Sequence, residues 1–306
     1  MVKVMVGQVA SQPEKESREI KLAHSPDSDD AFMFYALATH KLPTPGYKYT
    51  HVLADIQSLN EAALQEIYDV TALSFAAYPT LREKYVLLDC GASFGEGYGP
   101  LVVATHSMKP QDLKGKRIGV PGLKTSAYLT LKLYQPDFEA VVIPFDKIIE
   151  AVRNNVVEAG LLIHEGQLFF PQMGLHRVVD LGGEWCQRSG LPLPIGLNVI
   201  RRDIGVPAMQ RICAALARSV QHGLDHSCEA LRRVCRFGSR EEGRYTDRFV
   251  SMFANADSVN MPDDVRMGLR VLLSQVADLG LIETIPPLDV VHPAETSAQA
   301  QSLRAA

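Results

Sequence analysis

The chain has 306 residues, of which 46% are hydrophobic and 22% charged, with a formal net charge of −4. This is the ordinary profile of a globular protein with room for two domains, and it excludes disordered and collagen-like chains. The absence of a basic surplus excludes binding of nucleic acid through its phosphates. No apolar run approaches the roughly 18 residues of a membrane helix, so no membrane partner is expected.

Two features of the sequence bear on the compartment. The five cysteines are odd in number and contain no Cys-x-x-Cys pair, which favours free thiols in a reducing environment. The N-terminal apolar stretch is interrupted by Lys3, Gly7 and Gln8, which is too weak for a secretory signal. We therefore expect a cytoplasmic protein.

Short apolar runs alternate with helical patterns along the chain. The patterns predict strands at 20–24, 49–53, 70–73, 85–88, 101–104, 117–120, 141–144, 160–163 and 196–200. They predict helices at 29–39, 58–66, 75–82, 125–134, 147–154, 207–223 and 264–279. This alternation is typical of mainly parallel sheets with helices on both faces.

The two α/β units and the helical C-terminal part predict two lobes with a central cleft. We expect a larger, discontinuous lobe of residues 20–104 plus 197–292, a smaller lobe of 105–196, and flexible ends at 1–19 and 293–306. The segments 99–105 and 194–201 would cross between the lobes. A small ligand is expected in the cleft, at the carboxyl ends of the strands.

Two glycine-containing motifs resemble nucleotide sites but fail on context. Gly95-Glu-Gly97-Tyr-Gly99 leads from strand to strand rather than into a helix, and its spacing does not fit a dinucleotide fingerprint. The segment 122–125 lacks the register of a phosphate loop. Neither motif therefore indicates a nucleotide site.

Small polar residues stand where predicted strands end and helices begin. Ser74 follows the strand at 70–73, while Thr125 and Ser126 open the helix after Gly122. Backbone N–H groups at a helix start, together with hydroxyls, suit a carboxylate or phosphate. Each residue taken alone is better explained as an ordinary N-cap, but the repetition in two α/β units favours a shared anion site.

Two further candidates are titratable. His164 ends the apolar strand at 160–163, where an imidazole could act as a general base near pH 7; a structural histidine is the alternative. Asp27, Asp29 and Asp30 stand at the first strand-to-helix turn, where capping explains them. If they line the cleft, they would repel an anion and prefer hydroxyl groups of a ligand.

Six strings of the sequence stand out together: SPDSDDAFMFYAL (25–37), LSFAAYPTLREKYVLL (73–88), GASFGEGYGPLVVA (91–104), VPGLKTSAYL (120–129), GLLIHE (160–165) and GLPLPIGLNVIRRD (190–203). In combination they resemble the 1,4-dihydroxy-6-naphthoate synthase family of the futalosine route to menaquinone. The resemblance runs from about residue 20 to 205 and is weaker in the C-terminal helices. It implies a type II periplasmic-binding-protein-like fold, two α/β lobes with a central cleft, used as an enzyme.

The resemblance also implies an activity. Members of the family are carbon–carbon lyases that convert cyclic dehypoxanthine futalosine, a small carboxylate, to 1,4-dihydroxy-6-naphthoate and dihydroxyacetone without metal or organic cofactor. His164 would then be the catalytic base, and Ser74, Thr125 and Ser126 would belong to the ligand site. The matching strings add Asp29, Gly97 and Tyr98 as candidate substrate-binding residues.

One departure from the family stands in the first turn. The family usually has Ser-Pro-Cys-Pro-Asn-Asp, whereas this chain has Ser25-Pro26-Asp27-Ser28-Asp29-Asp30. Aspartate at position 29 adds a negative charge where a ligand would lie and removes an amide donor. An altered substrate preference and a paralogue that has lost the reaction are both consistent with this change.

Three interpretations of function compete. The lyase is the leading one, and a non-catalytic solute-binding protein of the same fold is the second. A chorismate dehydratase-like enzyme is the third, against which the Gly-Tyr-Gly-Pro and Ile-His-Glu strings favour the naphthoate synthase. A homodimer is compatible with all three.

Overall fold

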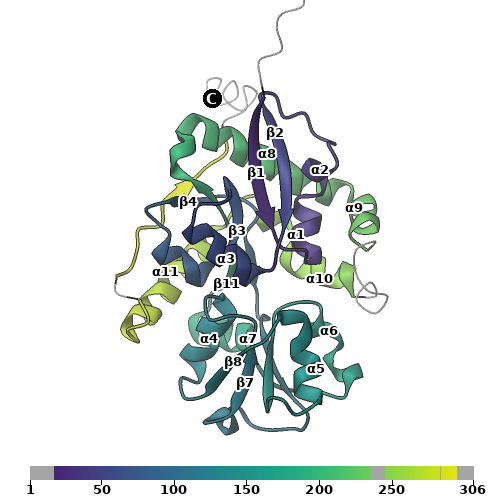
Figure 1. Ribbon diagram of the computed structural model, residues 1–306, viewed down its shortest axis with the longest axis vertical. Coiled ribbons are helices and arrows are strands. Elements are labelled where there is room, and N and C mark those ends of the chain that lie inside the picture. Colours follow the sequence, from purple (N-terminus) through teal and green to yellow (C-terminus); the bar gives the residue numbers. More distant parts are fainter. Residues whose placement is uncertain (1–16, 236–244, 283, 295–306) are drawn as a thin grey trace, which may run out of the picture.

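The computed structural model describes residues 17–235, 245–282 and 284–294, which form two lobes (Figure 1). The larger lobe is built on a seven-stranded sheet with the order β12-β4-β11-β3-β1-β2, in which β5 also pairs with β11. Its strands are β1 (Arg18–His24), β2 (Tyr47–Leu53), β3 (Val70–Ser74), β4 (Tyr85–Leu88), β5 (Ser93–Gly95), β11 (Leu193–Arg201) and β12 (Val290–Val291).

The smaller lobe is built on a five-stranded sheet with the order β10-β6-β9-β7-β8. Its strands are β6 (Leu101–Ala104), β7 (Arg117–Val120), β8 (Glu139–Val142), β9 (Ala159–Leu162) and β10 (His176–Asp180). The helices α4 (Ser126–Tyr134), α5 (Ile148–Arg153), α6 (Gly166–Phe169) and α7 (Leu181–Ser189) lie with this lobe (Figure 1).

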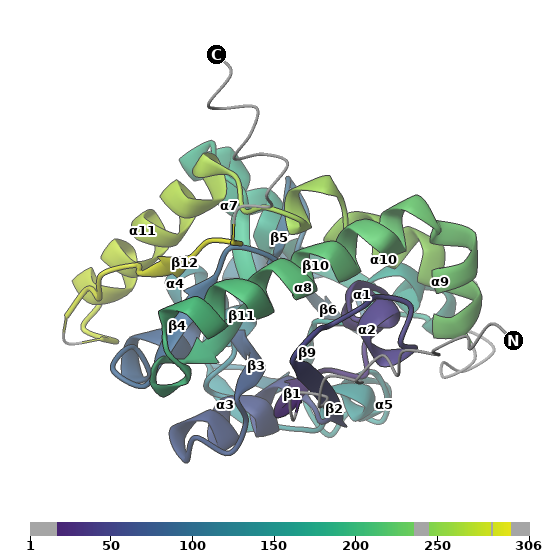
Figure 2. The ribbon, with the colours of Figure 1, turned by 90° about the horizontal axis from the view of Figure 1, so that it is seen from above.

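The other helices belong to the larger lobe. They are α1 (Ser28–Met33), α2 (Tyr35–Ala38), α3 (Ile56–Leu64), α8 (Val206–Asp225), α9 (Ser227–Val234), α10 (Thr246–Phe253) and α11 (Asp263–Asp278). Figure 2 shows α8 across the middle of the molecule, with α11 to one side and α9 and α10 to the other. The segment 75–80, predicted as α-helix, is a 3-10 helix that contains Pro79, a residue without the N–H that a continuing α-helix needs.

The sheets are mixed rather than mainly parallel. β11 is antiparallel to β3, β4 and β5, and β6 is antiparallel to β9 and β10. Both β6 and β11 directly follow a segment in which the chain passes from one lobe to the other. Each of these strands therefore runs opposite to its neighbours in the sheet. The pairing of Leu101–Ala104 also places this strand in the smaller sheet, whereas we expected it in the larger lobe, and all of Leu193–Arg201 lies in the larger sheet.

The predicted flexible ends are only partly described. β1 begins at Arg18, inside the segment expected to be flexible, while residues 1–16 and 295–306 lie outside the described part of the chain. The exact lobe boundaries otherwise stay a prediction.

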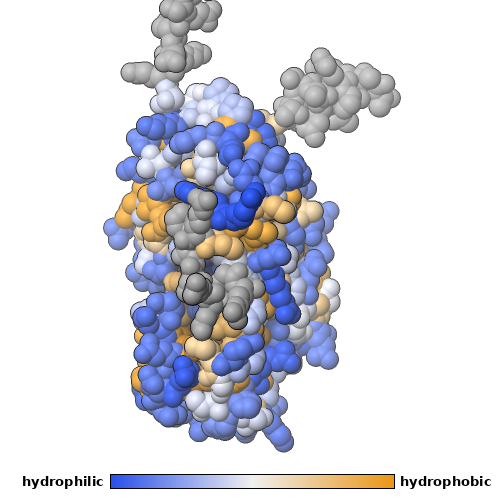
Figure 3. Space-filling view, turned by 90° about the vertical axis from the view of Figure 1, so that its right-hand side faces the viewer, coloured by the Kyte–Doolittle hydropathy of each residue, from blue (hydrophilic) through white to orange (hydrophobic). Residues whose placement is uncertain are grey.

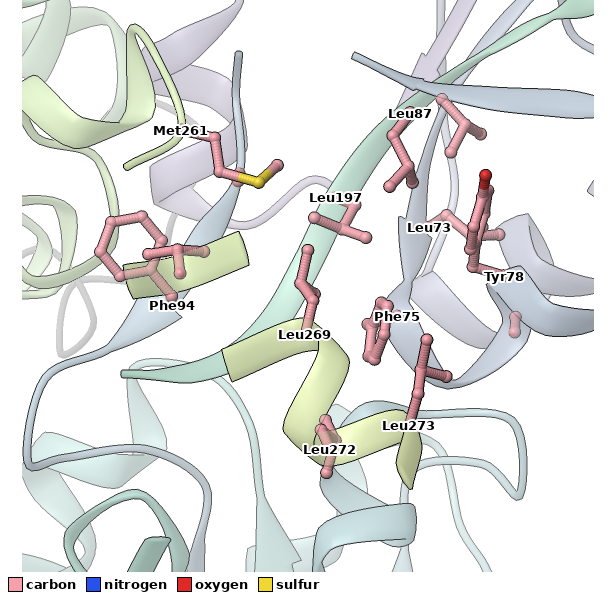
Figure 4. Close-up of a cluster of buried hydrophobic side chains, with 14 of the residues drawn as sticks. Leu73, Phe75, Tyr78, Leu87, Phe94, Leu197, Met261, Leu269, Leu272 and Leu273 are labelled. Atoms are coloured by element: carbon pink, nitrogen blue, oxygen red, sulfur yellow. The ribbon is translucent and has the colours of Figure 1, made fainter. Parts of the chain in front are cut away.

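Apolar side chains pack against both faces of the larger sheet. On one face, α11 presents Leu269, Leu272 and Leu273 toward Leu197 of β11 and Phe75 (Figure 4). These leucines recur at i, i+3 and i+4, so they share one side of the helix. On the other face, α8 contributes to a second apolar cluster. Each fully buried leucine contributes about 1.5–3 kcal/mol, so the sheet is a rigid support for the loops at its strand ends.

Within the described residues, no helix is both long enough and apolar enough to cross a membrane. Figure 3 shows a mainly hydrophilic face on which hydrophobic residues gather in separate patches.

Candidate active site

A cavity lies between the lobes, where the carboxyl ends of β1 and β3 face the N-terminal end of α4. Its empty volume is about 730 Å³, including the part open to solvent. Small-molecule sites commonly lie in clefts of this kind between domains. Among the residues that line it are Ser25, Asp27, Asp29, Asp30, Ala72, Ser74, Gly91, Ser93, Thr125, Ser126, Ala127, Ile163, Gln167, Asn198, Phe249 and Phe253.

The three hydroxyl residues singled out from the sequence come together in this cavity. Thr125 is the N-cap of α4: its Oγ1 accepts from the N–H of Tyr128 at 3.2 Å and donates to the carbonyl of Gly122 at 2.8 Å. Capping therefore occupies this hydroxyl. Ser74 ends β3, and no residue in the described ranges is hydrogen-bonded to its hydroxyl, which is free to meet a ligand.

Ser126 joins the two lobes. Its Oγ donates to the carbonyl of Ile195 in β11 at 2.6 Å and accepts from the N–H of Ala76 at 3.3 Å. The N–H groups of the first turn of α4, at Ser126 and Ala127, have no acceptor within the helix and carry the positive end of its dipole. With the Ser74 hydroxyl, they make this part of the cavity rich in hydrogen-bond donors, which suits a carboxylate.

Asn60 supports this donor-rich part, although no sequence pattern selects it. Its Oδ1 accepts from the N–H of Ser74 at 2.8 Å, and its Nδ2 donates to the carbonyl of Lys124 at 3.1 Å. One buried side chain thus fixes both the end of β3 and the loop before α4. A lone asparagine inside an amphipathic helix has no signature that separates it from a surface residue.

The acids of the first turn also line the cavity, as the sequence suggested they might if they faced the cleft. Asp29 Oδ2 accepts from the Ser93 hydroxyl at 3.2 Å, and Asp30 Oδ2 accepts from the N–H of Ser25 at 2.8 Å. Burial, reinforced by repulsion from Asp30 and Glu165, raises the pKa of Asp29 to about 7. Burial likewise raises the pKa of Asp30 to about 6 and that of Asp27 well above its ordinary value. These carboxyls therefore lose their protons at a higher pH than an ordinary aspartate does.

A side chain of the smaller lobe is hydrogen-bonded to this acidic turn. The Ser28 hydroxyl donates to Oε1 of Glu165, the residue that follows His164. Both side chains are buried. The contact brings a further carboxylate to the acidic turn and ties α1 to the start of α6.

His164 lies beside the cavity, but its ring does not line it. Nδ1 accepts from the N–H of Gly166 at 2.8 Å, and Nε2 lies 3.1 Å from the carbonyl of Phe145, to which it donates. The imidazole thus carries its proton on Nε2, and both nitrogens are engaged. Its neighbours Ile163 and Gln167 line the cavity, so the ring needs a change of side-chain torsion to reach a ligand.

Gly97 and Tyr98 do not line the cavity. Tyr98 instead donates from its hydroxyl to the carbonyl of Met252, and its ring meets that of Phe253 edge-on at 5.5 Å between centroids. Phe249 and Phe253 of α10 form an apolar wall of the cavity. Sequence reasoning missed both, because aromatic residues at helical spacing look like ordinary core.

The acidic turn does not form a metal site. Among the residues the structure describes, no three or more His, Cys, Asp or Glu side chains are arranged to hold a metal ion. What the cavity offers is donors at Ser74 and α4, acceptors at the acidic turn, and an aromatic wall. A molecule with a carboxylate, a flat ring and hydroxyl groups complements these features.

Comparison with known families identifies the wider group. A family model described as menaquinone biosynthesis matches residues 20–278. The chain belongs to this family. It is 37% identical over 267 residues to 1,4-dihydroxy-6-naphtoate synthase from Thermus thermophilus, which covers 87% of this chain and 97% of the relative. It is 32% identical over 281 residues to the protein of the same name from Streptomyces coelicolor, covering 90% and 98%. The resemblance stated from the sequence is thereby confirmed.

Solved structures confirm the fold class. A crystal structure of a protein from Archaeoglobus fulgidus is 43% identical, with a TM-score of 0.82, and covers 88% of this chain and all of that one. A Candida albicans protein described as having the generic periplasmic binding protein fold matches with a TM-score of 0.63 at 14% identity, covering 92% and 98%. The second likeness bears on the fold alone.

Proposed function

We propose that this chain is a 1,4-dihydroxy-6-naphthoate synthase, a carbon–carbon lyase that converts cyclic dehypoxanthine futalosine to 1,4-dihydroxy-6-naphthoate and dihydroxyacetone. The observation that carries the proposal is the cavity between the lobes. It combines a carboxylate seat, by which we mean the Ser74 hydroxyl and the N–H groups of Ser126 and Ala127, with a histidine at the adjoining strand end. The names of the two curated relatives support the same reaction.

In this proposal, some cavity residues bind the substrate and one transfers a proton. The Ser74 hydroxyl and the first-turn N–H groups of α4 bind the substrate carboxylate, and Phe249 and Phe253 pack against its ring. His164 takes a proton from the substrate, and the three-carbon fragment leaves as the second ring becomes aromatic. No metal or organic cofactor takes part in the proposed reaction.

The position of His164 sets a requirement on this mechanism. Nδ1 bears the lone pair, but the N–H of Gly166 occupies it. The ring must leave that hydrogen bond before it can accept a proton, so we propose that substrate binding displaces it. A general base in this position typically contributes about 10²- to 10⁴-fold to the rate.

A solute-binding protein without chemistry is the second candidate. It is favoured by the engagement of both His164 nitrogens, which leaves no free base at that position beside the cavity. The cytoplasmic location and a homodimer stay predictions from the sequence.

Turnover of cyclic dehypoxanthine futalosine tests the proposal. Wild type, His164→Ala and the matched control His176→Ala, an exposed histidine of β10, are incubated with the compound, and 1,4-dihydroxy-6-naphthoate is measured by chromatography. We expect product from wild type and the control, and at least about 10²-fold less from His164→Ala. Binding without product in all three proteins would favour the solute-binding protein, and equal product would remove His164 from the mechanism.

A further inference from the structure

Asn198 is a buried cavity residue whose polar groups are only half used. It lies in β11 opposite Ala72 of β3, is 1% exposed, and lines the cavity. Its Nδ2 donates to the carbonyl of Gly91 at 2.8 Å. Its Oδ1 is buried and has no hydrogen-bond partner among the described residues. A buried acceptor without a partner is costly, and in a cavity it indicates a donor brought by the ligand.

Gly91 fixes which way the amide points. It has a φ of +72°, and a Cβ built on it would lie 2.3 Å from Asn198 Nδ2, so only glycine allows the amide to rest there. Because Nδ2 is held by the Gly91 carbonyl, Oδ1 must point away from it. The unused acceptor is therefore a defined feature of the site rather than one of two equivalent amide orientations.

The polar groups at the acidic turn of residues 25–30 also offer hydrogen-bond acceptors to the cavity. With Asp29 ionised, the Ser93 hydroxyl donates its hydrogen bond to that carboxylate, which leaves Ser93 with only lone pairs to offer a ligand. One oxygen of Asp30 is already taken by the N–H of Ser25, and the carboxyl of Asp27 lines the cavity beside it. This part of the cavity consequently complements hydroxyl groups and disfavours a second carboxylate.

The sheet register places this acceptor group relative to the carboxylate seat. Asn198 pairs with Ala72, and Ser74 pairs with Gly196, so Ser74 and Asn198 stand two residues apart along the strands. Two residues of a strand span about 7 Å. A fused two-ring system is about as long, so one substrate can reach both places at once.

We propose that Asn198 Oδ1 accepts a hydrogen bond from a hydroxyl of the sugar-derived part of the substrate, which lies against Asn198, Ser93 and Asp29. The carboxylate then lies at Ser74 and the first turn of α4. This inference rests on the proposed function and adds the orientation of the substrate. It makes Asn198 a specificity-determining residue.

The alternative is a purely structural role, in which Asn198 only holds Gly91. The two roles differ in one respect. Substitution of a purely structural residue changes the dissociation constants of all ligands alike. Substitution of a residue that accepts a hydrogen bond from a ligand hydroxyl changes only those of ligands that carry this hydroxyl.

Calorimetric dissociation constants for a set of ligands test this difference. The set is cyclic dehypoxanthine futalosine and analogues in each of which one sugar-derived hydroxyl is replaced by hydrogen. We expect wild type to bind one analogue about 10- to 100-fold more weakly than the parent compound. Asn198→Leu should weaken the parent by a similar factor and leave that analogue unchanged.

Two further variants complete the design. Asn198→Asp keeps the acceptor oxygen and should still discriminate between the ligands, which also covers failure of the leucine variant to fold. Asn154→Leu, on the exposed end of α5, is the control for an amide-to-leucine change and should behave as wild type.

The outcomes separate the inference from the proposed function. Equal weakening of every compound by Asn198→Leu would overturn the inference while turnover by wild type upheld the function. If wild type discriminates between the parent compound and the analogue but does not turn the parent over, the inference about Asn198 stands and the proposed reaction is contradicted. A wild type that binds neither compound would overturn both.

Discussion

Asp29 controls the charge of the cavity at the residue scale. Its carboxyl is buried beside Asp30 and Glu165, and these surroundings raise its pKa to about 7. At the unfolded value of about 3.9 the same group is ionised well below neutral pH. The folded protein thus binds a proton between these two values that the unfolded chain releases. The contribution of the Asp29 carboxyl to the free energy of unfolding is therefore fully present below the unfolded pKa. It is lost progressively as the pH rises through the pKa of the folded protein.

Asp29→Asn should remove this dependence. The asparagine carries no charge at any pH, so the variant should gain stability relative to wild type as the pH rises from 5 to 8, by roughly 1–3 kcal/mol. Urea denaturation of both proteins at each pH measures the difference. Burial lowers the pKa values of His24 and of the partly buried His51 to about 4, so these two groups destabilise the folded protein on acidification, the opposite direction. They act equally in both proteins and cancel. Parallel stability curves would contradict the expectation.

At the scale of elements, the glycine-rich loop positions α10. The loop leads from strand to strand as predicted, although the strand before it, β5, was not among the predicted ones. It passes so close to α7 that a Cβ on Gly182 would lie 1.9 Å from the carbonyl oxygen of Tyr98. From this fixed loop, the Tyr98 hydroxyl reaches Met252 of α10. The helix in turn carries Phe249 and Phe253 into the cavity wall. Tyr98 thus acts on the cavity through α10.

Tyr98→Phe should therefore raise the KM for the substrate by about 2- to 10-fold and leave kcat nearly unchanged, because one hydrogen bond that holds the wall is lost. Steady-state kinetics on the variant measures both constants. Tyr128→Phe, a tyrosine packed on Phe138 within the smaller lobe, is the control. If the variant instead turned over about 100-fold more slowly at saturating substrate, the Tyr98 hydroxyl would have to touch the reacting part of the substrate.

The sequence predicted the elements whose signals are local and missed those that depend on distant partners. Ser74, Thr125 and Ser126 stand where apolar strands give way to helices, a pattern that periodicity reveals directly. The orientation of His164 could not be predicted, because Gly166 and Phe145 hold its ring through backbone atoms whose position depends on the fold. Asn198 looks like any polar residue in a strand until Gly91 is brought beside it. Likewise, β6 belongs to the smaller sheet because it pairs with β9 and β10, and its own residues do not reveal these partners.

At the scale of the whole molecule, side chains from each lobe meet across the cavity. Ser126 bonds to β11, Asn60 to the Lys124 carbonyl, and Ser28 to Glu165. The first two contacts join neutral groups beside the carboxylate seat. The Ser28 contact is different, because it holds Glu165 against a turn that already carries the carboxyls of Asp27, Asp29 and Asp30. Without the hydroxyl, no hydrogen bond at this place would oppose the repulsion between Glu165 and these carboxyls.

Ser28→Ala should consequently shift the molecule toward a more open arrangement of the lobes. Loss of the hydrogen bond and the remaining repulsion both favour separation, so we expect a larger radius of gyration in small-angle scattering and a KM raised about 2- to 10-fold. Thr44→Ala, which removes a hydroxyl that bonds to the Tyr47 carbonyl within the larger lobe, should change neither quantity. The effect should grow from pH 6 to 8, because Asp29, with its pKa of about 7, gains charge in that range. A radius of gyration identical to that of wild type at pH 8 would show that the remaining contacts close the lobes without Ser28.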